Sequence, residues 1–113
     1  MVTSTRPRIV CLCGSTRFRD QFAAVNRELT LAGQIVIAPG VFVHADDVPI
    51  SDQEKASLDA LHLAKIDLAD EVFVVNVDGY IGSSTANEIT YATGRGTPVR
   101  YLVDLKAHGG HAA

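Results

Sequence analysis

The stretch RIVCLCGST at residues 8–16 decides the fold of this 113-residue chain. Residues 8–13 are almost continuously apolar, which predicts a strand covered on both faces, as in a parallel sheet. Gly14 ends this run, and Ser15 and Thr16 follow it. From residue 18 to residue 32, apolar side chains recur in steps of four and three, which predicts a helix. The first 33 residues therefore predict a strand, a tight loop and a helix.

The same alternation continues along the rest of the chain. A second apolar run at residues 34–38 completes a strand–helix–strand unit. Residues 41–50 are expected to be irregular, and the sequence SDQE at residues 51–54 matches a helix capping box. We expect that helix to end near residue 69. The remaining expected elements are a strand at residues 72–77, a helix at 85–93 and a strand at 99–103.

Alternating strands and helices predict an α/β fold with an open parallel sheet and helices on both faces. A flavodoxin-like (Rossmann-like) sheet of four to five strands, in the order 2-1-3-4, suits these elements. Ligands of such sheets bind beyond the carboxyl ends of the strands, where the winding of the chain reverses. For this order, the two loops at that point are residues 14–17 and 78–84. The geometry therefore predicts a binding site between these loops.

Composition narrows the class of protein. Hydrophobic residues make up 47% of the chain and its formal net charge is -3, so a folded core is expected and a basic nucleic-acid-binding face is not. No apolar run approaches the roughly 20 residues of a membrane span. Residues 1–8 lead into the first strand rather than into a signal peptide. We expect a cytoplasmic protein with one domain at residues 1–113, an ordered core at about 8–105 and a flexible tail at 106–113, without nucleic-acid or membrane partners.

The first candidate loop contains Gly14, Ser15, Thr16 and Arg17. Backbone N–H groups at the start of a helix bind anions, and glycine lets a phosphate approach them closely. The two hydroxyls add donors, and the guanidinium of Arg17 can bind a phosphate or carboxylate through two parallel hydrogen bonds. The alternative is a simple turn in which Ser15 or Thr16 caps the helix.

The second candidate loop contains Gly82, Ser83 and Ser84, followed by Glu88. We expect Glu88 in the first turn of its helix, where its carboxylate could point into the crevice between the two loops. Residues 85–88 also fit a capping box, in which Glu88 would only satisfy backbone donors. Both interpretations remain open from the sequence.

His62 and Asp70 are eight residues apart around the end of one predicted helix, and His62 could face the sheet. A single histidine on a helix is more often a surface or structural residue than a base. Asp67 and Asp70 are unfavourable near a helix C-terminus, so a hydrogen bond or a function could compensate. The other histidines are expected to have no role: His44, His108 and His111.

Cys11 and Cys13 are two apart in the first strand, so their side chains point to the same face. Such positions are poor disulfide partners, and neither histidine nor further cysteine lies nearby at metal-site spacing. We expect two plain buried thiols and no metal.

Four features, taken in order, resemble the nucleoside 2-deoxyribosyltransferase superfamily, which includes the nucleoside-monophosphate N-glycosidases. They are the CGSTR loop at residues 13–17, the helix ending LAD at 68–70, the GSS loop at 82–84 with Glu88 behind it, and the strand entry GTPV at 96–99. The resemblance covers about residues 9–102.

The resemblance implies that Glu88 is a nucleophile that attacks the anomeric carbon and forms a covalent glycosyl-enzyme, as in retaining glycosidases. His62 occupies the position where the family usually has an aspartate, and its imidazole would assist as a proton donor. Ser83 and Ser84 resemble serines that hold a 5′-phosphate, which favours a nucleotide hydrolase over a transferase. The resemblance also implies a homodimer or larger homo-oligomer, and the reaction needs no cofactor. The alternative, from another class, is a non-catalytic module that binds a nucleotide or an ADP-ribose-like ligand.

Overall fold

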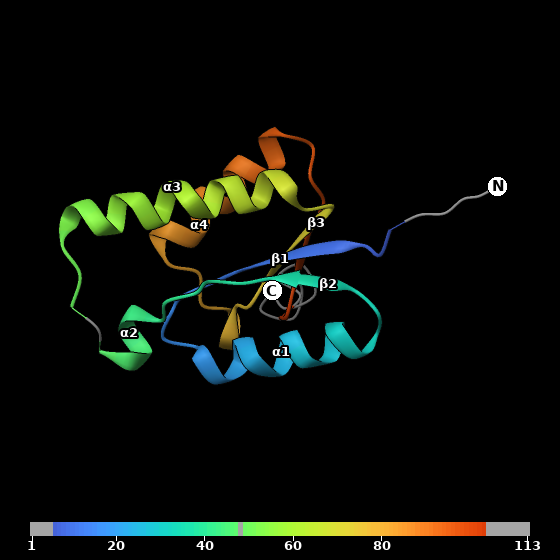
Figure 1. Cartoon of the computed structure of the whole chain (residues 1–113), viewed down its shortest axis with the longest axis horizontal. Coiled ribbons are helices and arrows are strands. Elements are labelled where there is room, and N and C mark those ends of the chain that lie inside the picture. The colour runs from blue at the N-terminus through green and yellow to red at the C-terminus, as the bar shows by residue number, and fades with distance from the viewer. Residues whose placement is uncertain (1–5, 48, 104–113) are drawn as a thin grey trace, which may run out of the picture.

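The computed structural model describes residues 6–47 and 49–103, and the expected flexible tail at residues 106–113 lies outside them. Helices separate successive strands in the described residues, with two of them, α2 and α3, between β2 and β3 (Figure 1). The elements are β1 (Ile9–Cys13), α1 (Arg19–Leu31), β2 (Ile35–Ile37), α2 (Val43–Asp46), α3 (Asp52–Leu68), β3 (Glu71–Val74), the 3₁₀ turn η1 (Val77–Gly79), α4 (Ser83–Gly94) and β4 (Val99–Tyr101).

Within these residues, four parallel strands form one open sheet in the order β2-β1-β3-β4. Helices α3 and α4 lie on one side of the sheet, and α1 and α2 lie on the other side (Figure 1). The predicted α/β fold, strand order and two-sided cover are therefore confirmed. The carboxyl ends of β1 and β3 lie side by side, because Cys13 pairs with Val74.

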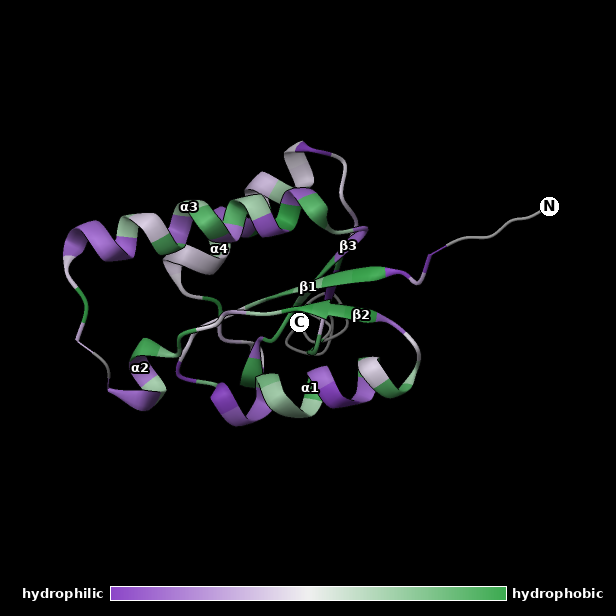
Figure 2. Ribbon diagram, in the orientation of Figure 1, coloured by the Kyte–Doolittle hydropathy of each residue, from purple (hydrophilic) through white to green (hydrophobic). Residues whose placement is uncertain are grey.

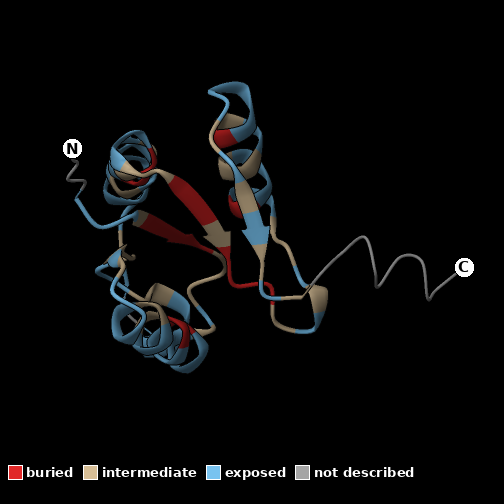
Figure 3. Cartoon of the chain, turned by 90° about the vertical axis from the view of Figure 1, so that its right-hand side faces the viewer, coloured by how far each residue is buried: buried red, intermediate tan, exposed pale blue. Residues whose placement is uncertain are grey.

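The core consists of two layers separated by the sheet. Alternate residues of β1 point to opposite faces: Cys11 and Cys13 pack with Ile66 of α3, whereas Val10 and Leu12 pack with Phe22 of α1. Figure 2 shows β1 as almost entirely hydrophobic and the helices as mixed. Burial is concentrated in the central strands β1 and β3, while β2 and β4 at the edges are more exposed (Figure 3).

The structure differs from the predicted elements at several places, including the last strand, which ends at Tyr101 rather than at residue 103. Residues 43–46 form the short helix α2 within the stretch expected to be irregular. The third strand ends at Val74 rather than at residue 77, because the buried Asn76 pairs its side-chain amide with both backbone groups of Val103 (2.9 and 3.0 Å). Helix α4 begins at Ser83, two residues earlier than expected. The capping box of α3, by contrast, is confirmed with both of its hydrogen bonds.

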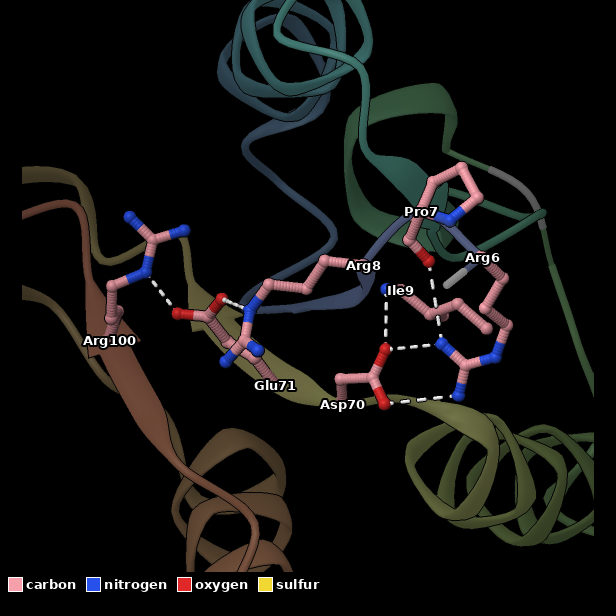
Figure 4. A network of polar contacts seen from close by, with 7 residues as sticks. All are labelled: Arg6, Pro7, Arg8, Ile9, Asp70, Glu71 and Arg100. Atoms are coloured by element: carbon pink, nitrogen blue, oxygen red, sulfur yellow. Dashed lines mark hydrogen bonds and ion pairs between the residues drawn. The ribbon is translucent and has the colours of Figure 1, made fainter. Parts of the chain in front are cut away.

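The end of the sheet remote from the candidate loops is held by two acidic residues (Figure 4). Asp70 accepts two hydrogen bonds from the Arg6 guanidinium (2.7 and 3.1 Å) and one from the backbone N–H of Ile9 (2.8 Å). Its neighbour Glu71 is buried and lies between Arg8 and Arg100.

None of the helices within residues 6–47 and 49–103 has the length and apolar character needed to span a membrane.

Candidate functional site

A cavity of about 460 Å³ opens at the carboxyl ends of β1 and β3, where the strand order predicts a site. Cavities of several hundred Å³ suit small-molecule ligands. All nine residues that the sequence nominates line it: Gly14, Ser15, Thr16, Arg17, His62, Gly82, Ser83, Ser84 and Glu88. The structure thus brings the two loops and the two candidate catalytic residues together, and their chemical roles remain predictions.

The first loop depends on a glycine that no other residue can replace without strain. Gly14 has a φ of +154°, and a Cβ at this position would lie 2.8 Å from the carbonyl oxygen of Val75 and 3.1 Å from the ring of Phe22. Such distances are shorter than ordinary van der Waals contact. The loop can therefore lie close against β3 only because residue 14 lacks a side chain.

Arg17 presents its guanidinium at the cavity wall. Its Nε donates to the hydroxyl of Ser15 at 3.0 Å, and the guanidinium lies 4.8 Å above the centre of the Tyr80 ring. Cation–π contact of this kind orients an arginine without neutralising its charge. The Thr16 hydroxyl and His44 Nδ1 lie 2.7 Å apart, which links the loop to α2. His44, to which the sequence assigned no role, lines the cavity.

The second loop places the start of α4 against the cavity. Gly82 is the N-cap residue of α4 and, having no side chain, caps none of the backbone N–H groups. Ser83 and Ser84 occupy the first two helical positions. The N–H groups of this first turn have no partner within the helix and favour negative charge. Glu88 consequently lies in the second turn rather than the first. The capping-box interpretation of residues 85–88 is wrong, and Thr85 is buried.

Glu88 and His62 meet at the inner wall of the cavity. Glu88 Oε1 lies 3.8 Å from His62 Nε2, and their side chains are 15% and 10% exposed. Burial raises the pKa of the Glu88 carboxyl above its ordinary value of 4.5. Burial by itself lowers the pKa of His62, but its contact with Cys11 and the charge of Glu88 outweigh that effect and raise it above 6.5. Each group therefore favours the protonated form more strongly than it does in water.

His62 also contacts both cysteines. Its Nε2 lies 3.3 Å from Cys13 Sγ and 3.8 Å from Cys11 Sγ. Both thiols are free and fully buried, as predicted, and His62 contacts them although it is remote in the sequence. Sequence spacing could not reveal this contact because 49 and 51 residues separate the partners. The two thiols interact with each other, which lowers the pKa of Cys11 to about 6 and raises that of Cys13.

Helix α3 contributes further lining residues that the sequence interpretation missed. Lys55 and Lys65 line the cavity together with His62, and the three positions share one face of the helix because they are seven and three residues apart. Lys55 pairs with Asp59 at 2.8 Å, and Lys65 donates to the carbonyl of Ala38 at 3.0 Å. Helical spacing around His62 would have identified both lysines.

Asp67 and Asp70 have structural partners away from the cavity. Asp67 accepts from the Tyr91 hydroxyl at 2.7 Å and pairs with Arg95 at 3.1 Å. Asp70 is held by Arg6 and the backbone of Ile9 at the other end of the sheet. These hydrogen bonds and ion pairs offset the unfavourable interaction of both carboxylates with the C-terminal end of the helix dipole. His62 and Asp70 do not act together at the cavity.

No protein-family model, curated protein or solved structure matched this chain in comparisons with known proteins. The observation that agrees with the family resemblance is the α/β fold itself, a parallel sheet of order 2-1-3-4 in the described residues.

Proposed function

We propose that this chain cleaves the N-glycosidic bond of a nucleoside 5′-monophosphate or nucleoside, by hydrolysis or deoxyribosyl transfer, through a covalent intermediate on Glu88. One observation carries the proposal: the carboxyl group of Glu88 is not used as a helix cap and lines the cavity that both glycine- and serine-containing loops share. A nucleophile needs such access to the anomeric carbon of a bound sugar.

In the proposed reaction, one carboxylate oxygen of Glu88 forms a bond to C1′ as the bond between C1′ and the base nitrogen breaks. The electron pair leaves with the base, and protonated His62, 3.8 Å from Glu88, supplies a proton to it. A water molecule, or a second base, then attacks C1′ and releases the Glu88 carboxylate, and the attacking group gives its proton to the now neutral His62. An oxocarbenium-like transition state carries positive charge, which an adjacent carboxylate stabilises.

The start of α4 and Arg17 give the cavity wall features that suit an anionic group. The first-turn N–H groups and hydroxyls of Ser83 and Ser84 offer donors at a helix N-terminus, and Arg17 adds a full positive charge. These features support a 5′-phosphate on the substrate, so we favour nucleotides over unphosphorylated nucleosides.

A second candidate function is a non-catalytic nucleotide-binding or ADP-ribose-binding module. The observation that favours it is the burial of Glu88, which raises the pKa of its carboxyl and so favours the neutral form. A neutral carboxyl donates a hydrogen bond to a sugar hydroxyl but is a poor nucleophile.

Incubation of the purified chain with nucleosides and their 5′-monophosphates, followed by chromatography for free base, tests the proposal. Glu88→Gln should reduce base release at least about a thousandfold, because a nucleophile cannot be replaced by an amide. Asp59→Asn is the matched control, since Asp59 is a second carboxylate on the cavity wall that is already paired with Lys55. It should change the rate by less than about tenfold.

A glycosyl adduct on the peptide containing Glu88, detected by mass spectrometry after acid quenching, would identify the intermediate. Thermal stabilisation by a nucleotide without release of base, in both wild type and Glu88→Gln, would instead establish the binding module.

A further inference from the structure

A cluster of three metal-ligating side chains lies behind the cavity. It consists of Cys11 and Cys13 from β1 and His62 from α3, and the ligating atoms lie within 4.8 Å of one another. Among the described residues, it is the only group of three or more histidine, cysteine, aspartate or glutamate side chains that we found placed to hold a metal ion. We call these three residues the Cys–His cluster.

The spacing of the Cys–His cluster is close to that of a tetrahedral zinc site. Bonds of about 2.3 Å to sulfur and about 2.0 Å to nitrogen place the sulfur and nitrogen atoms of such a site about 3.5 Å apart. In the structure, His62 Nε2 lies 3.3 Å from Cys13 Sγ and 3.8 Å from Cys11 Sγ. These two distances lie on either side of that value, and all three ligating atoms lie within 4.8 Å of one another.

The fold also provides a fixed scaffold and a route of entry for an ion. The two thiols share one face of the central strand β1, and His62 is on the helix packed against that face. The cysteines are fully buried, whereas His62 and Glu88 line the cavity. Glu88 Oε1, 3.8 Å from His62 Nε2, lies beside the position that a fourth ligand would take.

We propose that Cys11, Cys13 and His62 bind one divalent ion of the Zn²⁺ class, with the fourth coordination position directed toward Glu88 and the cavity. Two thiolates and an imidazole are a ligand set that zinc accepts, and three protein ligands leave one position open. In the bound state both cysteines are thiolates and Nε2 of His62 carries no proton, so the protons that these groups hold pass to solvent and the two thiolate charges balance the charge of the ion.

The metal site does not rest on the proposed glycosidase function. The two roles of His62 exclude each other, because a metal ion on Nε2 occupies the nitrogen that would hold the proton for the leaving base. If both proposals hold, Zn²⁺ should suppress base release, whereas metal binding is measurable even when base release is absent.

Titration of the full, reduced and chelator-treated chain with Co²⁺ tests the metal site. We expect one equivalent to produce thiolate-to-cobalt charge-transfer absorption in the near ultraviolet together with intense visible bands of tetrahedral cobalt. One equivalent of Zn²⁺ should remove both signals. Native mass spectrometry of the zinc complex should show one zinc ion per chain.

Variants locate the ligands. Cys11→Ser and His62→Gln should each weaken Zn²⁺ binding at least about a hundredfold, measured by competition with a chromogenic chelator. His44→Gln, which alters the other histidine of the cavity, and the double variant His108→Ala with His111→Ala should bind as wild type does. Circular dichroism establishes whether each variant is folded.

Absence of charge-transfer absorption in the wild-type chain would overturn the proposal, and so would a stoichiometry other than one zinc ion per chain. Unchanged affinity in the folded His62→Gln variant, or loss of binding in the His108→Ala and His111→Ala double variant, would also overturn it. Because the wild-type measurements stand alone, the proposal is testable even if Cys11→Ser does not fold.

Discussion

At the scale of single residues, the cavity combines a carboxyl group and an imidazole whose pKa values are both raised. Burial acts on Glu88, and contact with Cys11 and the charge of Glu88 act on His62. The proposed reaction needs the carboxylate ionised and the imidazole protonated. Both forms coexist only between the two pKa values, so the pair confines activity to a window of pH.

We therefore expect a bell-shaped dependence of kcat/KM on pH for base release. The acid limb should lie above pH 4.5, because protonation of Glu88 removes the nucleophile, and the alkaline limb should lie above pH 6.5, because deprotonation of His62 removes the proton donor. In His62→Gln, the alkaline limb should disappear while the acid limb remains. An alkaline limb that persists unchanged in this variant would show that another group supplies the proton.

The backbone conformation and close contacts of Gly14 lead to a prediction about the free energy of unfolding. Gly14→Ala should lower the free energy of unfolding by about 2–4 kcal/mol, because the added Cβ meets the Val75 carbonyl oxygen at 2.8 Å and φ is +154°. Urea unfolding followed by circular dichroism measures the change. Gly94→Ala is the control: it lies in α4 with no atom within 4 Å of an added Cβ, so it should be neutral or stabilising.

At the scale of elements, one face of α3 lines the cavity, and the residues after its C-terminus hold the far end of the sheet. Its inner face brings Lys55, His62 and Lys65 to the cavity. Immediately after its C-terminus, Asp70 fixes the turn into β3 through Arg6 and the backbone of Ile9 (Figure 4). The same helix therefore connects the site with the ion pairs at the far end of the sheet.

Asp70→Asn should destabilise the protein at neutral pH, since asparagine keeps an acceptor for Ile9 but loses the charge that Arg6 pairs with. The hydrogen bonds from Arg6 and Ile9 lower the pKa of Asp70 from 3.8 to about 2. The carboxylate thus stabilises the folded state above pH 3.8, and this contribution is lost as the pH falls toward 2. The difference in urea midpoint between wild type and variant should be present at pH 7 and shrink over that acid range.

The control for this prediction is Asp59→Asn, which removes an exposed pair with Lys55 inside one helix. Its effect at pH 7 should be below about 0.5 kcal/mol. An Asp70→Asn difference that stays constant from pH 7 to pH 2 would contradict the assigned pKa.

At the scale of the whole molecule, the parallel sheet sets the position of the cavity. The carboxyl ends of β1 and β3 are adjacent, and the chain leaves them toward opposite faces of the sheet. A hollow forms between the two departing loops, as in other open α/β sheets.

We also expect a homodimer or a larger homo-oligomer in solution. Leu61 and Leu68 are seven residues apart on α3 and are 53% and 65% exposed, which leaves apolar surface for a second copy. Light scattering after size exclusion should give a mass of at least roughly twice the 12.1 kDa of the chain. A mass of 12.1 kDa over the full concentration range would contradict this expectation.

The sequence alone determined the order of the four strands and of the helices α1, α3 and α4, the two-sided cover of the strands and the loops that meet at the cavity, but not the short helix α2. The elements follow from the periodicity of apolar residues within short stretches of sequence, and their arrangement follows from the rules for connections between parallel strands. Tertiary structure decided that Glu88 lies in the second turn of α4 and faces the cavity, and that His62 contacts Cys11 and Cys13. The contacts of His62 join side chains from separate elements, because 49 and 51 residues separate the histidine from the two cysteines. Whether these side chains meet depends on how α3 and α4 pack on β1. Helix packing is set by the whole core, which local patterns of residues do not specify.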